Sequence, residues 1–378
     1  MDFCLTEEQQ LIRSMIQEFA KQEVAPIAEE IDRLGKFPEQ TVKRLAELEL
    51  TGMPYPRKYG GAEADYVSYA IVIEELSRAC ASTGVILALQ TLSASPIYQF
   101  GTEMQKEKWL PLLTQCKKLG AFALTEAGAG TDAGSIKTTA VLDGDEYLLN
   151  GSKTFITTGD MAGIFIVFAV TEQGKGTKGI SAFIVESNTP GFSIGKHEDK
   201  MGMRGSHTTE LFFKDCRIPR SNILGREGEG FKIAMVALDG GRISIAAQAV
   251  GIAQACLDES IRYSKERIQF GRPIAANQAI QWMIADMATD VEAARLLTYN
   301  AAYHKGQGRA VSLESAMAKV FASETAMKHA VKAIQIQGGY GYIRGAKVER
   351  LLRDAKITEI YEGTSEAQRM IISGNLLR

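Results

Sequence analysis

Cysteine and histidine are scarce in this chain, and their spacing excludes the common metal and disulfide frameworks. Five cysteines and four histidines occur in 378 residues. The cysteines are odd in number and never form a C-x-x-C pair, and the histidines show no H-E-x-x-H or comparable spacing. We therefore predict a reducing compartment, no metal, and histidines that are surface or packed residues. These residues are Cys4, Cys80, Cys116, Cys216, Cys256, His197, His207, His304 and His329.

An excess of charge of one sign is also lacking. Lys and Arg number 43 against 45 Asp and Glu, so the formal net charge is -2. The interspersed charges leave no basic stripe for nucleic acid or an anionic membrane surface, which makes both partners unexpected. No apolar run approaches the length that spans a bilayer, and no targeting peptide is visible. We expect a cytoplasmic protein of prokaryotic type.

The two best-known phosphate-binding loops are missing. In the segment 124–132 the glycines do not fit G-x-G-x-x-G followed by a helix, and G-K-[ST] is absent. The segment nevertheless follows a predicted strand and mixes small residues with hydroxyls. Such a backbone lets amides approach an anionic or planar ligand closely. Taken alone, the segment is also compatible with an ordinary loop.

Periodicity divides the chain into three parts. Residues 1–120 read as helical, beginning with a capping box at Thr6 and Gln9, and Pro26 is expected to interrupt the first helix. Residues 121–230 carry short β-rich runs and a hairpin signal at Asp143-Gly144. Residues 231–378 return to a helical pattern. The predicted helices of the first part include 40–50, 67–78 and 103–113, and the predicted strands are 121–125, 138–142, 147–149, 154–158, 164–171, 180–185 and 210–213.

The segment Tyr361-Glu362-Gly363 places a carboxylate just before a predicted helix start. Ser365 with Gln368 fits a capping box there. Acids are favoured at helix starts by the helix dipole, so Glu362 is either an ordinary acid at that position or a catalytic base.

Two glycines interrupt the helical pattern 231–262 at Asp239-Gly240-Gly241-Arg242. They should destabilise that helix by roughly 2 kcal/mol relative to alanine. Either they allow close helix packing, or a ligand crosses a bare stretch of helix with Asp239 and Arg242 as polar anchors.

Two further segments carry ligand-binding chemistry with equally simple alternatives. The segment 267–273 is predicted to be a loop between helices, and its guanidinium groups suit phosphate contacts or an ordinary surface. The glycines of 335–341 suit a helix C-terminus.

Taken in order, these segments resemble the acyl-CoA dehydrogenase family over essentially the whole chain, most closely its short-chain, butyryl-CoA type. The fold that this resemblance implies is mainly α with a β domain: an N-terminal helical domain at 1–120, a middle β-barrel or sandwich at 121–230, and a C-terminal four-helix bundle at 231–378. The matching segments are 124–132, Phe155-Ile156-Thr157, Met203-Arg204-Gly205-Ser206, Asp239 to Arg242, Arg267-x-x-Phe270-Gly271, 335–339 and 361–364.

The resemblance also implies FAD as cofactor and a homotetramer, a dimer of dimers, in which the cofactor crosses a subunit interface. One set of residues would hold the flavin: Phe122, Leu124, Thr125, Gly130, Thr131, Phe155, Ile156 and Thr157. A second set would reach the adenosine and pyrophosphate of a neighbouring subunit's FAD: Arg267, Phe270, Gln278, Gln335, Ile336, Gly338 and Gly339. Thr364, Ser365 and Glu366 would return to the cofactor.

For the substrate, the resemblance implies contacts from Thr131, Asp239, Gly240, Gly241, Arg242 and Gly363. Glu362 matches the base that removes the α-proton of the acyl thioester while the flavin accepts a hydride from the β-carbon. Some relatives carry their base on the helix immediately before the arginine. Gly241 occupies that position here, which leaves Glu362.

The activity implied is dehydrogenation of a short-chain acyl-CoA to trans-2-enoyl-CoA, with electrons passed to an electron-transfer flavoprotein. Alternatives that use the same residues are an enoyl-CoA reductase fed by a bifurcating electron-transfer flavoprotein, and a dehydrogenase for branched or cyclic acyl groups. An alternative of another class is a non-catalytic flavin- or acyl-CoA-binding subunit. The presence of Glu362 disfavours that alternative.

Overall fold

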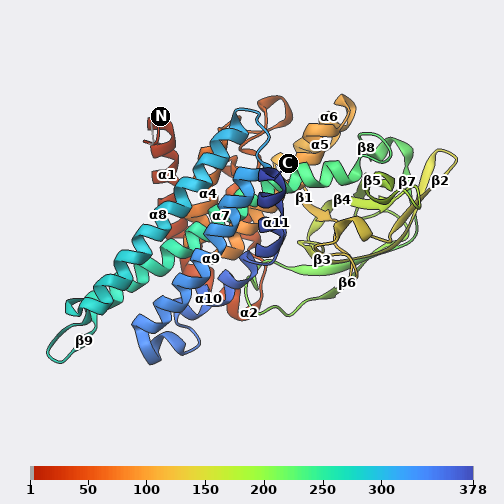
Figure 1. Cartoon of the computed structure of the whole chain (residues 1–378). Helices are drawn as coiled ribbons and strands as arrows, with labels where there is room; N and C mark the ends of the chain where they lie inside the picture. Colours follow the sequence, from red (N-terminus) through yellow and green to blue (C-terminus); the bar gives the residue numbers. More distant parts are fainter. Residues whose placement is uncertain (1–3, 378) are drawn as a thin grey trace.

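A computed structural model describes residues 4–377, and in it helices precede and follow a β-sheet region (Figure 1). The chain is mainly helical, with the sheet in the middle, as predicted. The helical elements before the sheet are α1 (Glu7–Phe19), η1 (Ala20–Val24), η2 (Ala25–Ile27), α2 (Ala28–Leu34), α3 (Glu39–Glu47), η3 (Leu50–Gly52), η4 (Arg57–Tyr59), α4 (Tyr66–Ala79), α5 (Ala81–Phe100) and α6 (Glu103–Thr114).

The first helix begins and ends as its sequence predicts. Thr6 and Gln9 form the capping box, in which each side chain accepts a hydrogen bond from the other residue's backbone N–H. The α-helix ends at Phe19 and continues as a π turn and a 3-10 turn around Pro26. Helix α5 was not predicted as a separate element, because it is apolar on all sides and contains Pro96.

The strands form one open, eight-stranded sheet with the order β6-β7-β3-β2-β4-β5-β8, and β1 pairs with β4 in parallel. Within the described part of the chain β6 and β8 end this order, so the sheet does not close into a barrel. The elements are β1 (Leu119–Ala123), η5 (Ala133–Ser135), β2 (Thr139–Asp143), β3 (Glu146–Thr157), β4 (Ala162–Val170), η6 (Gly176–Gly179), β5 (Ile180–Glu186), β6 (Phe192–His197), β7 (Thr208–Pro219), η7 (Arg220–Asn222) and β8 (Ile223–Leu224).

Two sequence predictions for the sheet need correction. The runs 147–149 and 154–158 belong to one strand, β3, whose pairing with β7 contains two irregularities in register. Strand β6 was missed because most of its residues are exposed, which leaves little apolar alternation. The predicted hairpin at Asp143-Gly144 is confirmed by the antiparallel pairing of β2 with β3.

The central strand β4 joins the sheet to the helices. Its side chains alternate between two cores: Ile166 and Phe168 pack with residues of α5, α6 and α7, whereas Phe165 and Val167 pack inside the β domain. Because both faces are buried, the strand is apolar along its length.

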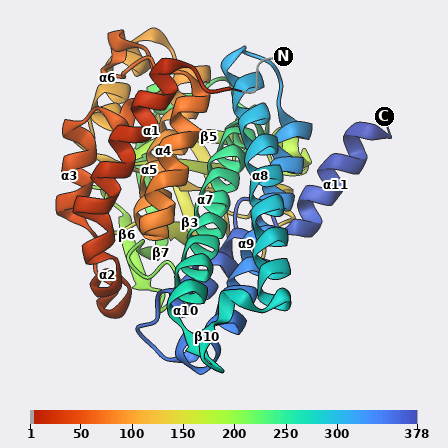
Figure 2. The same cartoon turned by 90° about the vertical axis from the view of Figure 1, so that its left-hand side faces the viewer.

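The C-terminal region is a helical bundle, with α7 packed against α8 and α9 and also against α4 of the N-terminal region (Figure 2). The segment 267–273, predicted to be a loop, is instead a short β-hairpin. The elements are α7 (Gly230–Glu266), β9 (Ile268–Gln269), β10 (Arg272–Pro273), η8 (Ile274–Ala276), α8 (Gln278–Gly306), α9 (Ser312–Gln337), η9 (Gly338–Tyr342), α10 (Lys347–Thr358) and α11 (Ser365–Leu376).

By length and composition, α7 is apolar enough to cross a membrane, so the expectation that no such segment exists was wrong for this helix. However, 72% of its apolar window is buried inside the protein. A core helix of a globular bundle has the same composition, and α7 occupies that place here.

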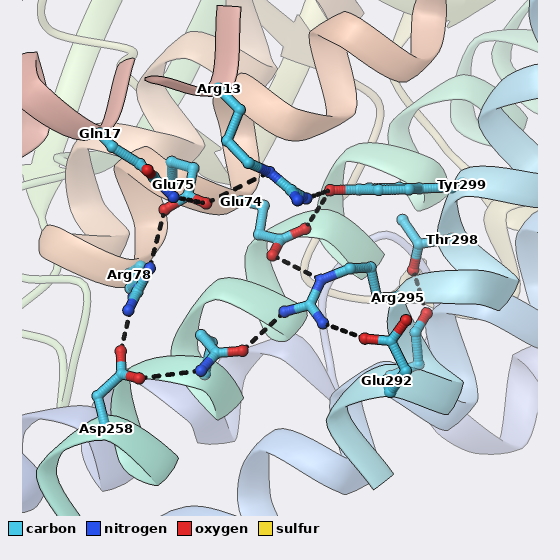
Figure 3. A network of polar contacts seen from close by, with 12 residues as sticks. Arg13, Gln17, Glu74, Glu75, Arg78, Asp258, Glu292, Arg295, Thr298 and Tyr299 are labelled. Carbon is cyan, nitrogen blue, oxygen red and sulfur yellow. Dashed lines mark hydrogen bonds and ion pairs between the residues drawn. The ribbon is translucent and has the colours of Figure 1, made fainter. Parts of the chain in front are cut away.

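A network of charged side chains fastens the N-terminal helices to the bundle (Figure 3). Glu74 on α4 is almost fully buried and accepts hydrogen bonds from Arg295 Nε at 2.9 Å and from the Tyr299 hydroxyl at 2.7 Å. Arg13 on α1 donates to the same hydroxyl, and Arg78 donates to Asp258 at 2.6 Å. A buried carboxylate with several donors is costly to separate from them, so Glu74 fastens α4 to α8, and the Arg78–Asp258 pair links α4 to α7.

Candidate active site

Glu362 lies in a tight turn between α10 and α11. Its φ is 53° and that of Gly363 is 96°, so two successive residues are left-handed. The helix that follows is capped by Thr364, whose hydroxyl accepts from the Ala367 N–H at 3.2 Å. The predicted capping box at Ser365 and Gln368 was therefore wrong: the N-cap is Thr364, one residue earlier, and the residue three positions later is Ala367, which has no side chain to complete a box.

Two side chains anchor the carbonyls of this turn. Gln368 Nε2 donates to the Gly363 oxygen at 2.8 Å and to the Glu362 oxygen at 3.3 Å. Lys319, from the buried face of α9, donates from Nζ to the same Gly363 oxygen at 2.7 Å. A non-glycine residue at positive φ is held only where its surroundings fix it, and these bonds fix Glu362.

The carboxylate of Glu362 rests on the bare backbone of α7 at Gly241. A Cβ added to Gly241 would overlap Glu362 Oε2 and lie 2.9 Å from Cδ. Oε2 is buried and has no hydrogen-bond partner within the described part of the chain. Burial raises the pKa of Glu362 to about 7, although the cations Arg242 and Lys319 act in the opposite direction.

Asp239 and Arg242, predicted as substrate anchors, pair with each other across one turn of α7. Arg242 is 4% exposed, and its Nε is buried without a partner. Asp239 also accepts from Ser312 Oγ at 3.2 Å, and burial raises the pKa of this carboxyl despite the neighbouring Arg242. Among residues 4–377, a Cβ added to Gly240 would meet only the end of the Lys305 side chain within 4 Å.

A small enclosed cavity of about 10 Å³ lies beside Gly241, between α4, α5 and α7. Thr91 contributes to its wall, whereas Leu87 and Leu89 pack in hydrophobic clusters. The lining residues are Tyr66, Tyr69, Thr91, Leu92, Ser95, Ala237, Gly240, Gly241, Ser244 and Lys305.

The residues predicted to hold a flavin lie at the end of β1 and along β3. The Thr154 N–H donates to the Thr125 oxygen at 2.9 Å and so joins the two segments. A Cβ at Gly128 or Gly130 would meet nothing within 4 Å, which leaves that backbone open to a ligand. Phe155 has a φ of 57° and a side chain exposed to 64%, a geometry that suits contact with a planar ring.

The rest of the predicted flavin set divides between exposed and buried positions. Thr131 is exposed, Phe122 and Thr157 are half-buried, and Leu124 is 6% exposed. Ile156 is 1% exposed with its side chain in the β core. Only its backbone is available to a ligand.

A buried ion pair that the sequence did not predict supports the segment 124–132. Lys153, fully buried, donates to Glu126 at 2.8 Å and to the Leu124 oxygen at 3.0 Å. Glu126 also accepts from the backbone N–H groups of Lys137 and Thr138. Burial lowers the pKa of Lys153 to about 8.

The second predicted cofactor set lies at the far end of the bundle, at the hairpin labelled β9 in Figure 1. Arg267, Ile336, Gly338 and Gly339 line one cavity of about 460 Å³, together with Tyr340, over whose ring the Arg267 guanidinium lies at 5.3 Å. Gln278 begins α8, Gln335 lies in the last turn of α9, and Phe270 is fully exposed. The sheet region with the flavin set lies at the opposite end of the molecule in the same view.

Asp160, His197 and His207 gather in one cluster, although the sequence showed no ligand spacing. His207 Nδ1 contacts Asp160 Oδ2 at 2.6 Å, and Nε2 lies 3.0 Å from the Gly35 carbonyl, which can only accept. The hydrogen bond to Asp160 raises the pKa of His207. Through these two contacts His207 links the β domain to the end of α2.

Family models of the acyl-CoA dehydrogenase N-terminal, middle and C-terminal domains match residues 6–117, 121–216 and 228–377. These matches cover the sheet and the helical regions on both sides of it, and they make the chain an oxidoreductase acting on CH–CH bonds. The chain belongs to the acyl-CoA dehydrogenase family, whose members carry a flavin. The open backbone at Gly128 and Gly130 and the exposed Phe155 fit such a group.

Relatives of known function are similar over the full length. The short-chain specific acyl-CoA dehydrogenase of Clostridium acetobutylicum is 53% identical, with all of both chains covered. Butyryl-CoA dehydrogenase from Megasphaera elsdenii is 49% identical with a TM-score of 0.98 over all of both chains. A chain solved in work on the electron transferring flavoprotein of Acidaminococcus fermentans and flavin-based electron bifurcation is 52% identical with a TM-score of 0.99, again over all of both chains.

Proposed function

We propose that the protein is an FAD-dependent short-chain acyl-CoA dehydrogenase that makes trans-2-enoyl-CoA and passes electrons to an electron-transfer flavoprotein. The observation that carries this proposal is the buried Glu362 carboxylate against Gly241, whose Oε2 has no hydrogen-bond partner among residues 4–377. The similarity to butyryl-CoA and short-chain dehydrogenases supports the substrate class.

The chemistry assigns one proton transfer to the chain itself. When bound, FAD supplies a two-electron acceptor for the hydride leaving the β-carbon. Glu362 removes the α-proton, and its pKa of about 7 makes it a stronger base than an ordinary carboxylate near pKa 4.3. Its missing hydrogen-bond partner leaves Oε2 available for that proton.

We further propose that the cofactor-binding residues of the first set hold the flavin, and that those of the second set hold the adenosine half of a neighbouring subunit's FAD. The two sets lie at opposite ends of the folded molecule (Figure 1). This supports an FAD site that two subunits share. A homotetramer in the cytoplasm, with domains at 1–120, 121–230 and 231–378, is part of this proposal. The bacterial relatives are consistent with that location.

Arg267→Ala should weaken FAD retention because a phosphate contact across subunits is lost. The effect should be clearest in dilute enzyme, where dissociation of the subunits separates the two halves of the FAD site. Flavin content after gel filtration over a range of protein concentrations measures this. Arg272→Ala, on the same hairpin but outside the cavity, is the matched control. Equal flavin content in wild type and Arg267→Ala at every concentration would remove the role of Arg267.

The pH dependence of kcat/KM should show an acidic limb with its midpoint near pH 7. The pKa of Glu362 is raised to about 7, and only the ionised form accepts a proton, so activity is present above this pH and falls about tenfold per unit below it. A profile that stays flat down to about pH 5, as an ordinary glutamate would give, contradicts this assignment.

The acyl group and the direction of reaction are tested together. We expect kcat/KM to be highest for a short straight chain in a series from two to eight carbons that includes one branched and one cyclic acid. A maximum at the branched or cyclic acid would replace the substrate class.

A second candidate, an enoyl-CoA reductase with a bifurcating electron-transfer flavoprotein, draws support from the similarity to the Acidaminococcus fermentans chain. It predicts faster enoyl-CoA reduction than acyl-CoA oxidation with that partner.

A further inference from the structure

A buried lysine that the proposed mechanism does not use lies beside the catalytic turn. Lys319 projects from α9 and is fully buried, at a position flanked along the helix by the buried Ala316 and Ala322. A buried ammonium group is uncommon and normally has a specific partner. Lys319 donates its hydrogen bond to a neutral group, the Gly363 carbonyl, at 2.7 Å.

That bond acts on the backbone of the turn rather than on a charge. Glu362 and Gly363 are both left-handed, and the Gly363 oxygen accepts from Lys319 and Gln368 at once. This carbonyl belongs to the peptide that follows Gly363, so moving it would shift Gly363 and, through it, the backbone of Glu362 and the direction of the carboxylate. Lys319 therefore restrains the orientation of Glu362 against Gly241.

The charged groups around Glu362 differ in how far they are already neutralised. From α7, Arg242 acts on the carboxylate but is paired with Asp239. From α9, Lys319 acts on it, and among residues 4–377 no carboxylate forms an ion pair with Lys319. The phenols Tyr69 on α4 and Tyr361 in the turn also face Glu362, and both are neutral because burial raises their pKa.

Two acids influence the lysine from other elements. Glu359, at the end of α10, and Glu366, in the first turn of α11, both favour its charged form, as does Glu362, whereas Arg242 opposes it. Burial has the largest effect and lowers the pKa of Lys319 to about 8. The ammonium is therefore still charged over the range where Glu362 becomes ionised.

We propose that Lys319 is a positioning residue for the catalytic base: it anchors the Gly363 carbonyl and supplies the positive charge that favours the ionised Glu362. This inference rests on the proposed role of Glu362. Loss of the cation should raise the pKa of the carboxyl further, because an opposite charge lowers the pKa of an acid. The pH at which the base becomes active then moves upward.

The experiment measures the rate of acyl-CoA-dependent flavin bleaching in single turnovers against pH. Lys319→Met removes both charge and donor, whereas Lys319→Gln removes the charge and keeps an N–H donor on a side chain one bond shorter. Lys328→Met is the control, since Lys328 lies on the same helix and pairs with Asp290 at the surface. Flavin content and melting temperature are recorded for each variant.

We expect the acidic limb to shift upward by about one pH unit in both Lys319 variants, so that near pH 6 they are about tenfold slower than wild type. Lys319→Gln should approach the wild-type rate at high pH, whereas Lys319→Met stays slower because its carbonyl anchor is lost. Lys328→Met should keep the wild-type profile.

A uniform loss of rate with an unshifted limb would mean a purely structural role and overturn the proposal. Failure of both Lys319 variants to fold, while Lys328→Met folds, would also overturn it. Glu362→Gln is measured in parallel: if that variant turns over like wild type, the proposed function fails. If it is inactive and the Lys319 limb is unshifted, only the role of Lys319 fails.

Discussion

Glu362→Gln is expected to lower turnover by about 10²-fold or more while the protein keeps its flavin and binds acyl-CoA. The amide has nearly the shape of the carboxyl but accepts no proton at neutral pH. Since Oε2 has no hydrogen-bond partner among residues 4–377, no hydrogen bond of that atom is lost by the change. Removal of a buried ionisable group should leave stability unchanged or raised.

The matched control is Glu324→Gln on the surface of α9, where the carboxylate pairs with Arg369. It should retain wild-type turnover. Near-normal activity of Glu362→Gln would show that Glu362 is not the catalytic base. If the wild type itself turned over no acyl-CoA but bound flavin, the non-catalytic subunit would become the better interpretation.

Gly241→Ala is expected to have effects of opposite sign on stability and activity. An added Cβ overlaps Glu362 Oε2, so the carboxylate must turn away from its place on α7. Displacement of a reacting group by about 1 Å can reduce rate about 10²-fold, and we expect a loss of that order. Gly241 lies inside α7, where alanine is favoured over glycine by about 1 kcal/mol, so the melting temperature should not fall.

Gly374→Ala is the control for this change. Gly374 lies inside α11, and a Cβ there meets nothing within 4 Å. It should raise stability and leave turnover unaltered. A Gly241→Ala enzyme with normal kcat would show that the carboxylate does not need this surface, whereas loss of folding would show that α7 packs more tightly at Gly241 than the Glu362 contact alone requires.

The sequence predicted those elements of the fold whose signals lie between residues close together in the chain. The capping box of α1 and the hairpin at Asp143-Gly144 each involve neighbours in sequence, and both are confirmed. Helix α5 lacks a polar face because other helices and the sheet surround it, so periodicity could not separate it. Strand β6 is exposed and is held by its pairing with β7, a contact between distant residues.

The sequence predicted those parts of the site that lie within single motifs. The segment around Glu362 marked a carboxylate at a helix start, and the glycines of α7 marked a bare helix surface. Only the three-dimensional structure shows that the Glu362 carboxylate lies directly against Gly241. Lys319 had a signal, a lysine flanked by alanines on the apolar stripe of α9, but its target lies 44 residues away in sequence.

The most direct test is an anaerobic absorbance titration of the purified protein with butyryl-CoA. The account predicts that the oxidised flavin band bleaches in the wild type, and that it persists in Glu362→Gln. A flavin band that neither butyryl-CoA nor any other acyl-CoA from two to eight carbons bleaches in the wild type would contradict the assignment of this protein as a short-chain acyl-CoA dehydrogenase.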